Sequence, residues 1–200
     1  LPQMQRTSTK RLQQCNWAQA VEGGIDSSHI SFLHSSTDAQ FTANKNLPRR
    51  NKYLGIDRHP VFDVRDVDYG VLISARRNGE EDSYYWRITQ CLMPFYQMIP
   101  PVVPEDDTSK ASYTGHAWVP IDDENTWTWT FSANPHRDFT PKEAEVSGGA
   151  GGMWGPIDEN YRPVQNRDNN YMLDRAAQKN DTFTGISGIP NQDAAVQESM

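Results

Sequence analysis

The sequence predicts an α+β domain in which an antiparallel β-sheet is flanked by helices. From residue 61 onward, apolar and polar residues alternate with the period of two that is typical of strands. The pair Asn78-Gly79 is favourable for the turn of a β-hairpin. Helix signals come before and after this stretch, so the helices are expected to pack against the sheet.

The segment before the strands, residues 17–34, predicts a short helical region. Gly23 and Gly24 interrupt its pattern, and Asp26 is placed to cap the N-terminus of a short helix that carries His29 and extends toward His34. Residues 35–60 are polar and contain the loop signals PRRNK and DRHP. We therefore expect irregular structure between this helix and the first strand.

The middle of the chain predicts two sets of strands. Residues 61–67, 69–76 and 83–90 are expected to be strands, and a Pro-rich connector is expected at 93–107. Residues 113–119 and 126–132 are expected to form a further hairpin. In its second strand, Trp127, Trp129 and Phe131 share one face and threonines share the other. This alternation predicts a strand that is buried on one side.

Helices are predicted again toward the C-terminus. Thr140 as N-cap, Pro141 at the first helical position and Glu143 form a helix start with a capping box. The Gly-rich residues 147–156 match neither the phosphate-loop nor the dinucleotide-binding pattern. Residues 168–179 and 192–200 are expected to be helices, separated by a Gly- and Pro-containing loop at 184–191.

Length, charge and composition limit the possible functions. A chain of 200 residues corresponds to about one domain. It has 19 basic and 26 acidic residues and a net charge of −7, which argues against a nucleic-acid partner. It has no apolar run long enough for a transmembrane helix, and its first ten residues lack the apolar core of a signal peptide. We therefore expect a cytoplasmic protein without a membrane partner.

The cysteines and histidines limit the possible metal sites. Cys15 and Cys91 are too few for a disulfide framework, a four-cysteine zinc site or a four-thiolate iron–sulfur cluster. His29 and His34 are five residues apart, whereas two ligands on one helical face are three or four apart. A shared metal site therefore requires a bend, a helix end or a loop between them. The alternative is that His29 caps or packs while His34 faces solvent.

The other three histidines are His59, His116 and His136, and none has a candidate partner close in sequence. We expect each of them to be structural or exposed.

Residues 16–34, NWAQAVEGGIDSSHISFLH, closely resemble the iron-binding segment of Rieske non-heme iron oxygenases, in particular the phthalate-dioxygenase-like branch. The family signature is N-W-x-Q followed by E-G-x-x-D-x-x-H-x-x-x-x-H. The matching positions are Asn16, Trp17, Gln19, Glu22, Gly23, Asp26, His29 and His34. Further stretches resemble the same branch in the same order: YYWRITQ, MPFY, IPP, WVPIDDENTWTW, GGMWGPIDENYRP and NQDAAVQES. The resemblance covers nearly the whole chain and implies a helix-grip-like catalytic domain.

The resemblance also implies a mononuclear Fe(II) site held by His29, His34 and Asp193. Two imidazoles and one carboxylate leave open positions on the metal for O2 beside a substrate. Asp193 is assigned as the third ligand by the resemblance. Asn191-Gln192-Asp193 matches the Gln-Asp or Glu-Asp pair with which a helix begins near the end of the family's catalytic domain. The residues alone also allow Asp193 to be only the N-cap of the final helix.

For Asp26 the resemblance implies a role in electron transfer. In the family, the corresponding aspartate bridges the iron-bound histidine to a cluster-bound histidine of a neighbouring subunit. Asp26 lies three residues before His29, where it can accept the other ring N–H of that ligand. Glu22 and Asn16 are expected to contact the ligands without binding the metal themselves. The alternative is that Asp26 only caps a helix.

The chain departs from the family in one respect. A Rieske [2Fe–2S] centre needs two Cys and two His, which the family arranges as C-x-H and C-x-x-H. Cys15 is followed by Asn-Trp and Cys91 by Leu-Met, so neither begins such a motif. We therefore expect residues 1–200 to be part of a catalytic domain, with the cluster elsewhere in the full-length protein. By itself this chain should not turn over with electrons from a flavin and iron–sulfur reductase. The family also implies a homotrimer or a multiple of one.

The expected reaction is oxygenation of an aromatic, carboxylated substrate, by ring dihydroxylation or oxidative O-demethylation. Arg87, a charge between Trp86 and Ile88 on a predicted strand, is a candidate for binding the carboxylate. The alternative for Arg87 is a structural ion pair on the far face of the sheet. The alternative function is a non-catalytic helix-and-sheet module that binds an apolar ligand.

Arg58 is the second candidate for substrate contact. It belongs to a basic cluster with Arg49, Arg50 and Lys52. Such a cluster is either a substrate entrance or a solvated loop.

Overall fold

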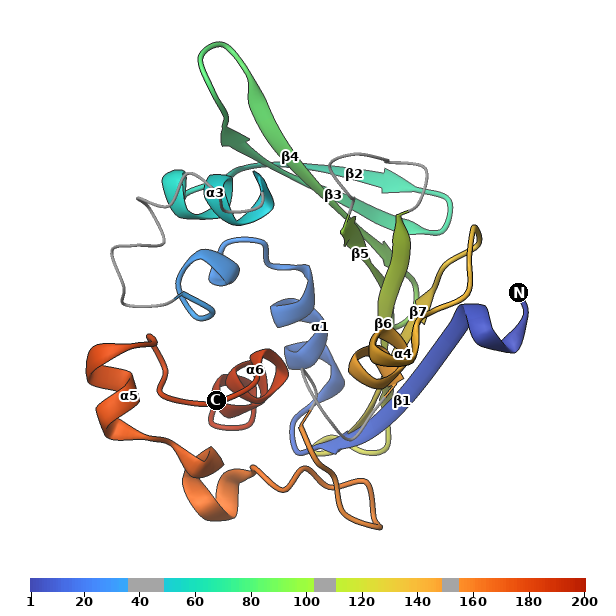
Figure 1. Cartoon of the computed structure of the whole chain (residues 1–200), viewed down its shortest axis with the longest axis vertical. Helices are drawn as coiled ribbons and strands as arrows, with labels where there is room; N and C mark the ends of the chain where they lie inside the picture. The colour runs from blue at the N-terminus through green and yellow to red at the C-terminus, as the bar shows by residue number, and fades with distance from the viewer. Residues whose placement is uncertain (36–48, 103–110, 149–154) are drawn as a thin grey trace.

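The computed structural model of the chain describes residues 1–35, 49–102, 111–148 and 155–200, without the side chains of residues 49–51, 102 and 148. Within this part, seven strands form one antiparallel sheet in the order β1-β7-β6-β5-β4-β3-β2 (Figure 1). The strands are β1 Arg6–Gln13, β2 Val61–Val67, β3 Gly70–Asn78, β4 Tyr84–Leu92, β5 Tyr96–Val102, β6 Ser112–Pro120 and β7 Thr126–Ala133. The predicted α+β class is confirmed.

Helices cover one side of this sheet. Figure 1 shows α1, α3 and α6 on the same side, while α4 packs on β1 and β7. The α-helices are α1 Trp17–Ile25, α3 Arg49–Ile56, α4 Pro141–Gly148, α5 Arg175–Asn180 and α6 Ile189–Gln197, and the 3-10 helices are η1 Gln3–Gln5, η2 His29–Ser31 and η5 Arg167–Met172. In the described residues, no helix is both long and apolar enough to cross a membrane.

The predicted strands are confirmed, and the structure adds two that the sequence did not indicate. β1 pairs with β7 along its whole length, from Arg6 opposite Ala133 to Gln13 opposite Thr126. β5 forms inside the segment expected to be a Pro-rich connector and pairs with both β4 and β6. These two strands contribute Arg11, Gln13 and Gln97 to the side of the sheet that faces the helices.

The sheet buries its polar side. In β7 the buried residues are Thr126, Thr128, Thr130 and Ser132, while Trp129 on the other face is 38% exposed. On that outer face, Lys10 lies 4.5 Å from the ring centroid of Trp127 and 4.2 Å from that of Tyr161. The strand is buried on one side as predicted, and its threonines face the helices.

The predicted helices have mixed outcomes. The capping box of α4 is present, because the Thr140 amide donates to Glu143 and the Glu143 amide donates to the Thr140 hydroxyl. The single helix predicted at 168–179 is wrong. It is interrupted at Asn170, Tyr171 and Met172, which all have positive φ angles. α5 begins only after this break.

Two further segments differ from the prediction. α3 occupies part of residues 35–60, which were expected to be irregular. The final helix begins earlier than predicted, at Ile189, with Gly188 at the N-cap position and Pro190 in the first turn. Asp193 therefore lies inside α6, and its alternative interpretation as an N-cap is wrong.

α1 lies very close to the sheet. A Cβ at Gly24 would collide with the ring of Trp118 and with the side chain of Gln97. Trp118 packs with Cys15 and Ala20 in a small buried cluster at this contact. Gly24 thus allows the end of α1, and the residues that follow it, to rest directly on β5 and β6.

Candidate metal centre

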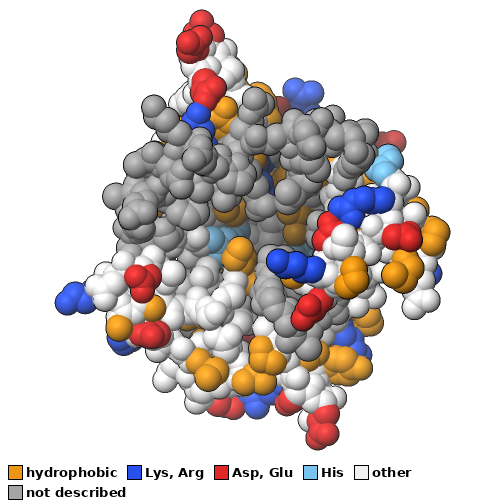
Figure 2. All heavy atoms as spheres, in the orientation of Figure 1, with side chains coloured by type: hydrophobic (Ala, Val, Ile, Leu, Met, Phe, Trp, Pro, Cys, Tyr) orange, Lys and Arg blue, Asp and Glu red, His pale blue; other side chains and the backbone are white. Residues whose placement is uncertain are grey.

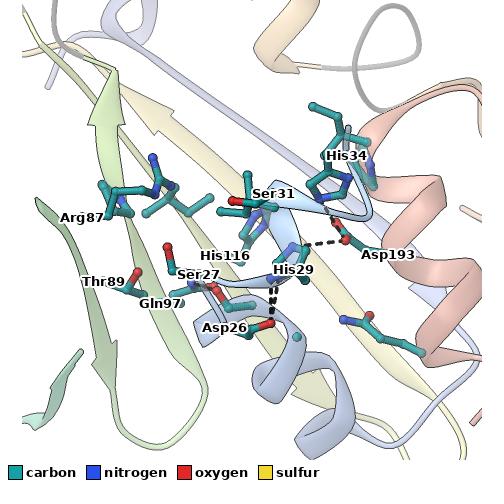
Figure 3. Close-up of a pocket in the computed structure, with 18 of the residues that line it drawn as sticks. Asp26, Ser27, His29, Ser31, His34, Arg87, Thr89, Gln97, His116 and Asp193 are labelled. Atoms are coloured by element: carbon teal, nitrogen blue, oxygen red, sulfur yellow. Dashed lines mark hydrogen bonds and ion pairs between the residues drawn. The ribbon is translucent and has the colours of Figure 1, made fainter. Parts of the chain in front are cut away.

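A cavity of about 410 Å³ lies between the helices and the polar side of the sheet. The face of the molecule shown in Figure 2 is hollowed near its centre, where a histidine side chain is visible. Figure 3 shows His29, His34 and Asp193 on the helical side of this cavity, with Arg87, Thr89 and Gln97 on the strands opposite.

The three predicted ligands converge. Nε2 of His34 lies 3.2 Å from Oδ1 of Asp193, and Nε2 of His29 lies 3.6 Å from the same oxygen. One ligand atom from each of the three residues lies within 4.8 Å of the other two. Two imidazole nitrogens and a carboxylate oxygen suit Fe(II). The residues present therefore fit the metal that the sequence resemblance implied.

The five-residue spacing of the histidines is explained by a turn between them. The carbonyl of His29 accepts hydrogen bonds from the amides of Phe32 and Leu33, at 2.9 and 2.7 Å. This closes η2 and brings His34 back beside His29, with the two ring centroids 5.0 Å apart. A continuous helix would place residues five apart on different faces.

Asp26 caps this turn and also faces the first ligand. Its carboxylate accepts from the amides of Ser28 and His29 at 2.7 and 2.9 Å. Oδ2 of Asp26 lies 3.5 Å from Nδ1 of His29. Partial burial would raise the pKa of Asp26, but the His29 ring and the two amides outweigh burial and lower the pKa to about 2. Asp26 is therefore a carboxylate at neutral pH.

Asn16 and Glu22 have other positions than the sequence suggested. Asn16 caps α1, accepting from the amide of Ala18 at 2.9 Å and donating to the carbonyl of Asp123 at 3.1 Å. Glu22 is exposed on α1. In the described residues, neither side chain lines the cavity or hydrogen-bonds to one of the three ligands.

Arg77 hydrogen-bonds to the segment before the His29 turn, a role that no sequence pattern indicated. The residue is completely buried. Its guanidinium donates to the carbonyl of Ser27 at 2.6 Å, to the Ser27 hydroxyl at 3.2 Å and to the carbonyl of Asp57 at 3.0 Å. Burial, and then the charge of Arg87, lower the pKa of Arg77. Arg77 thus links β3 by hydrogen bonds to the segment just before His29.

Arg11 plays a similar part for α6. It is buried on β1 and donates to the carbonyl of Pro190 at 3.0 Å, in the first turn of that helix. Burial lowers the pKa of Arg11, while the charges of Asp193 and Glu198 act in the opposite direction. A buried cation on the sheet therefore stabilises the start of the helix that carries Asp193.

Arg87 faces the cavity and not the far side of the sheet. It is 4% exposed. Within the described residues its guanidinium has no hydrogen-bond or ion-pair partner, and its Nε is buried without one. The structural ion pair considered for Arg87 is absent from this part of the chain. An unpaired guanidinium in a cavity wall is well placed to bind an anion.

Of the basic cluster, Arg58 lines the cavity and Lys52 does not. Arg58 lines the opening and lies 5.9 Å from the ring centroid of Phe32. Lys52 pairs with Glu80 instead. The side chains of Arg49 and Arg50 lie outside the described residues.

His116 is a cavity residue that sequence reasoning missed. Its ring hydrogen-bonds to the hydroxyl of Thr130 at 2.9 Å. Burial, followed by the nearby Arg11, lowers the pKa of His116 to about 4, so it is neutral at physiological pH. His59 and His136 are exposed, as expected.

The chain is similar in sequence and in fold to known proteins. The family model of the LigXa C-terminal domain-like proteins matches residues 2–200. The chain belongs to this family. The chain is 35% identical, over 192 residues, to the oxygenase subunit of phthalate 4,5-dioxygenase from Pseudomonas putida. It is 32% identical, over 197 residues, to the oxygenase subunit of 3-chlorobenzoate-3,4-dioxygenase from Comamonas testosteroni.

These matches cover 93% and 92% of the chain but only 42% and 44% of the two relatives. The chain therefore spans less than half of their length. The crystal structure of dicamba monooxygenase bound to 3,6-dichlorosalicylic acid aligns with 98% of the chain and 48% of its own, at a TM-score of 0.51 and 11% identity. This last similarity shows a shared fold. The resemblance to the catalytic domain of Rieske oxygenases is confirmed.

Replacing Arg77 by Met tests the support of the His29 turn. We expect the free energy of unfolding to fall by about 2–6 kcal/mol, because the buried carbonyl of Ser27 and the partly buried carbonyl of Asp57 lose their donor at about 1–3 kcal/mol each. Urea denaturation monitored by Trp fluorescence measures this. The control is Arg76→Met, on the other face of β3, where the guanidinium lies 4.4 Å from the Tyr84 ring centroid. Equal losses for the two variants would contradict the assigned role.

Proposed function

We propose that this chain is the catalytic-domain part of a Rieske-type oxygenase that binds one Fe(II) through His29, His34 and Asp193. We propose further that it oxygenates an aromatic carboxylate, by ring dihydroxylation or O-demethylation. The main support is one juxtaposition. Three ligand atoms that fit Fe(II) meet at the wall of a cavity whose opposite wall carries Arg87, which has no partner among the described residues. When bound, Fe(II) supplies the activation of O2.

The cavity residues bind and orient the substrate in this proposal. Arg87 forms charge-assisted hydrogen bonds to the substrate carboxylate, which turns the aromatic ring toward the three ligands. Apolar side chains surround the ring and exclude water; those that line the cavity are Ile30, Leu54, Ile99, Pro100, Trp118, Ile189 and Pro190. Arg58, at the opening, attracts the anion as it enters.

Asp26 transfers electrons in this proposal and does not bind the metal. Its carboxylate faces Nδ1 of His29, on the side of the ring away from Asp193. The side chain is 40% exposed, so a group on another subunit can reach it. These two properties suit a bridge between His29 and a cluster ligand of a neighbouring subunit.

The complete enzyme requires more than these 200 residues in this proposal. A Rieske [2Fe–2S] domain elsewhere in the full-length protein delivers electrons, which come from a flavin and iron–sulfur reductase. The full-length protein is a homotrimer, or a multiple of one, in the cytoplasm. The curated relatives, more than twice as long as their matched segments, are consistent with such an additional domain.

Iron binding is the first test. We expect the purified chain to bind one equivalent of Fe(II) under anaerobic conditions, and the variant with His29→Ala and His34→Ala to bind none, because only Asp193 remains of the donor set. Iron is measured by colorimetric assay after gel filtration, and circular dichroism checks that the sheet is intact. His136→Ala, at an exposed histidine, serves as control. Full iron occupancy in the double variant would disprove the site; a wild-type chain without iron would favour the non-catalytic binding module.

The role of Arg87 is tested by ligand binding. We expect wild-type protein to bind phthalate more tightly than neutral phthalamide, and Arg87→Met to weaken phthalate binding by about 10- to 100-fold, since a hydrogen bond to a charged group contributes about 1.5–3 kcal/mol. Phthalamide binding should change little. Calorimetric titration measures both, with Arg65→Met on the exposed edge strand β2 as control. If the variant binds both ligands like the wild type, Arg87 does not bind the substrate carboxylate.

Asp26→Asn tests electron transfer in the full-length protein with its cluster. We expect near-normal iron content, a reducible cluster and severely slowed reoxidation of that cluster, because the substitution keeps one acceptor oxygen but removes the charge. Stopped-flow absorbance follows the reoxidation, and Glu22→Gln, an exposed carboxylate on α1, is the control. Loss of iron in proportion to activity would make Asp26 a ligand or a support, and normal activity would leave it only the cap of the turn.

A further inference from the structure

Gln192, the residue just before Asp193, contacts the other nitrogen of His34. Its Oε1 lies 2.7 Å from Nδ1 of His34. Its Nε2 donates to the carbonyl of Ile186 at 2.9 Å. Gln192 is 8% exposed; its contact with Ile186 is buried and its contact with His34 is partly buried. The His34 ring is therefore held at Nδ1 by Gln192 and faced at Nε2 by Asp193.

The contact with Ile186 fixes which end of the amide faces His34. The Ile186 carbonyl can only accept, so the NH2 group of Gln192 must point toward it. Ile186 itself is buried with Tyr171 and Ala194, and its amide donates to the Thr184 hydroxyl at 3.1 Å. The position of this carbonyl is therefore fixed, and it sets the orientation of the Gln192 amide. The other end of the amide, Oε1, is an acceptor.

An acceptor at 2.7 Å requires hydrogen on Nδ1 of His34. The lone pair of the neutral ring is then on Nε2, which is the nitrogen that points toward Asp193. A histidine that binds a metal commonly donates its other N–H to an acceptor that fixes its tautomer and orientation. The contacts around His34 have this arrangement.

We propose that Gln192 is a positioning residue that holds His34 with hydrogen on Nδ1, so that Nε2 is presented as a metal ligand. This inference rests on the metal site of the proposed function. It distinguishes the two histidines: the acceptor facing His29 is the anionic Asp26, whereas the acceptor at His34 is a neutral amide. α6 thus supplies a ligand and the positioning group of a second ligand from consecutive residues.

The test compares Gln192→Met with Gln192→Glu. Methionine removes both contacts at similar volume. Glutamate still accepts from His34 but cannot donate to Ile186 when ionised. We expect Met to weaken Fe(II) binding by about 10- to 100-fold, and Glu to stay within about threefold of the wild type. A role limited to the Ile186 contact would damage both variants equally, and that result would overturn the proposal.

A second measurement reads the proton itself. With diamagnetic Zn(II) in the site, NMR of 15N-histidine-labelled protein should show His34 bound through Nε2, with a slowly exchanging proton on Nδ1. We expect this proton to exchange at least tenfold faster in Gln192→Met and to remain protected in Gln192→Glu. Gln197→Met is the matched control, because it removes another buried glutamine contact of α6, the one to Gln13, without touching His34.

The outcomes separate the two proposals. A wild-type chain that binds neither Fe(II) nor Zn(II) contradicts the metal site itself. Zinc bound to His34 through Nδ1, or a Gln192→Met variant with unchanged proton exchange and iron affinity, overturns the role of Gln192 while leaving the metal site in place. If Gln192→Met does not fold, the wild-type spectrum and Gln192→Glu still decide between the two nitrogens of His34.

Discussion

The side of the sheet that faces the helices is polar, and the need to hydrogen-bond buried polar groups determines what can pack on it. An unpaired buried donor or acceptor costs about 1–3 kcal/mol, so each arginine on this face needs a partner. Arg77 finds carbonyls before His29 and after α3, and Arg11 finds a carbonyl at the start of α6. Hydrogen bonds from these arginines of the sheet therefore hold in position the segments that carry the candidate ligands. In the part of the chain that the structure describes, Arg87 alone of these three arginines has no partner, and it faces the cavity.

Different interactions stabilise the outer face of the sheet. Aromatic residues of β7 and Tyr161 surround the ammonium group of Lys10, so cation–π attraction adds to apolar packing there. The difference between the two faces explains why β7 buries its threonines and leaves Trp129 partly exposed. Threonine can fill a buried position beside a binding cavity because its hydroxyl finds local partners, as Thr128 does with Gln13 and Thr126 with the carbonyl of Cys15.

The sequence predicted what local pattern determines. The alternating strands, the capping box of α4 and the position of Asp26 at the start of the His29 turn all follow from neighbouring residues. It did not predict β1 and β5, because neither has clean alternation: β1 carries a run of polar residues and β5 contains two prolines. Their strand structure comes from pairing with distant partners.

The site shows the same limit. Periodicity cannot bring together residues such as His34 and Gln192, which are 158 positions apart, so only the family resemblance placed Asp193 beside the histidines. Arg87 could be suspected because a charge between apolar strand residues is unusual. Arg77 gave no such signal, since it lay just beyond the predicted end of its strand and its partners are carbonyls and serine hydroxyls of distant segments.

The position of Gln192 and Asp193 next to each other on α6 has a consequence for how such a domain can diverge. Consecutive helical residues are separated by about 100° around the axis, so one inserted or deleted residue early in α6 would rotate both away from His34 together. Single substitutions can be compensated one at a time, but a shift of helix register cannot. We therefore expect descendants of this sequence to vary freely in the length of surface connections while keeping the residue count from the Arg11-bound carbonyl of Pro190 to Asp193 unchanged.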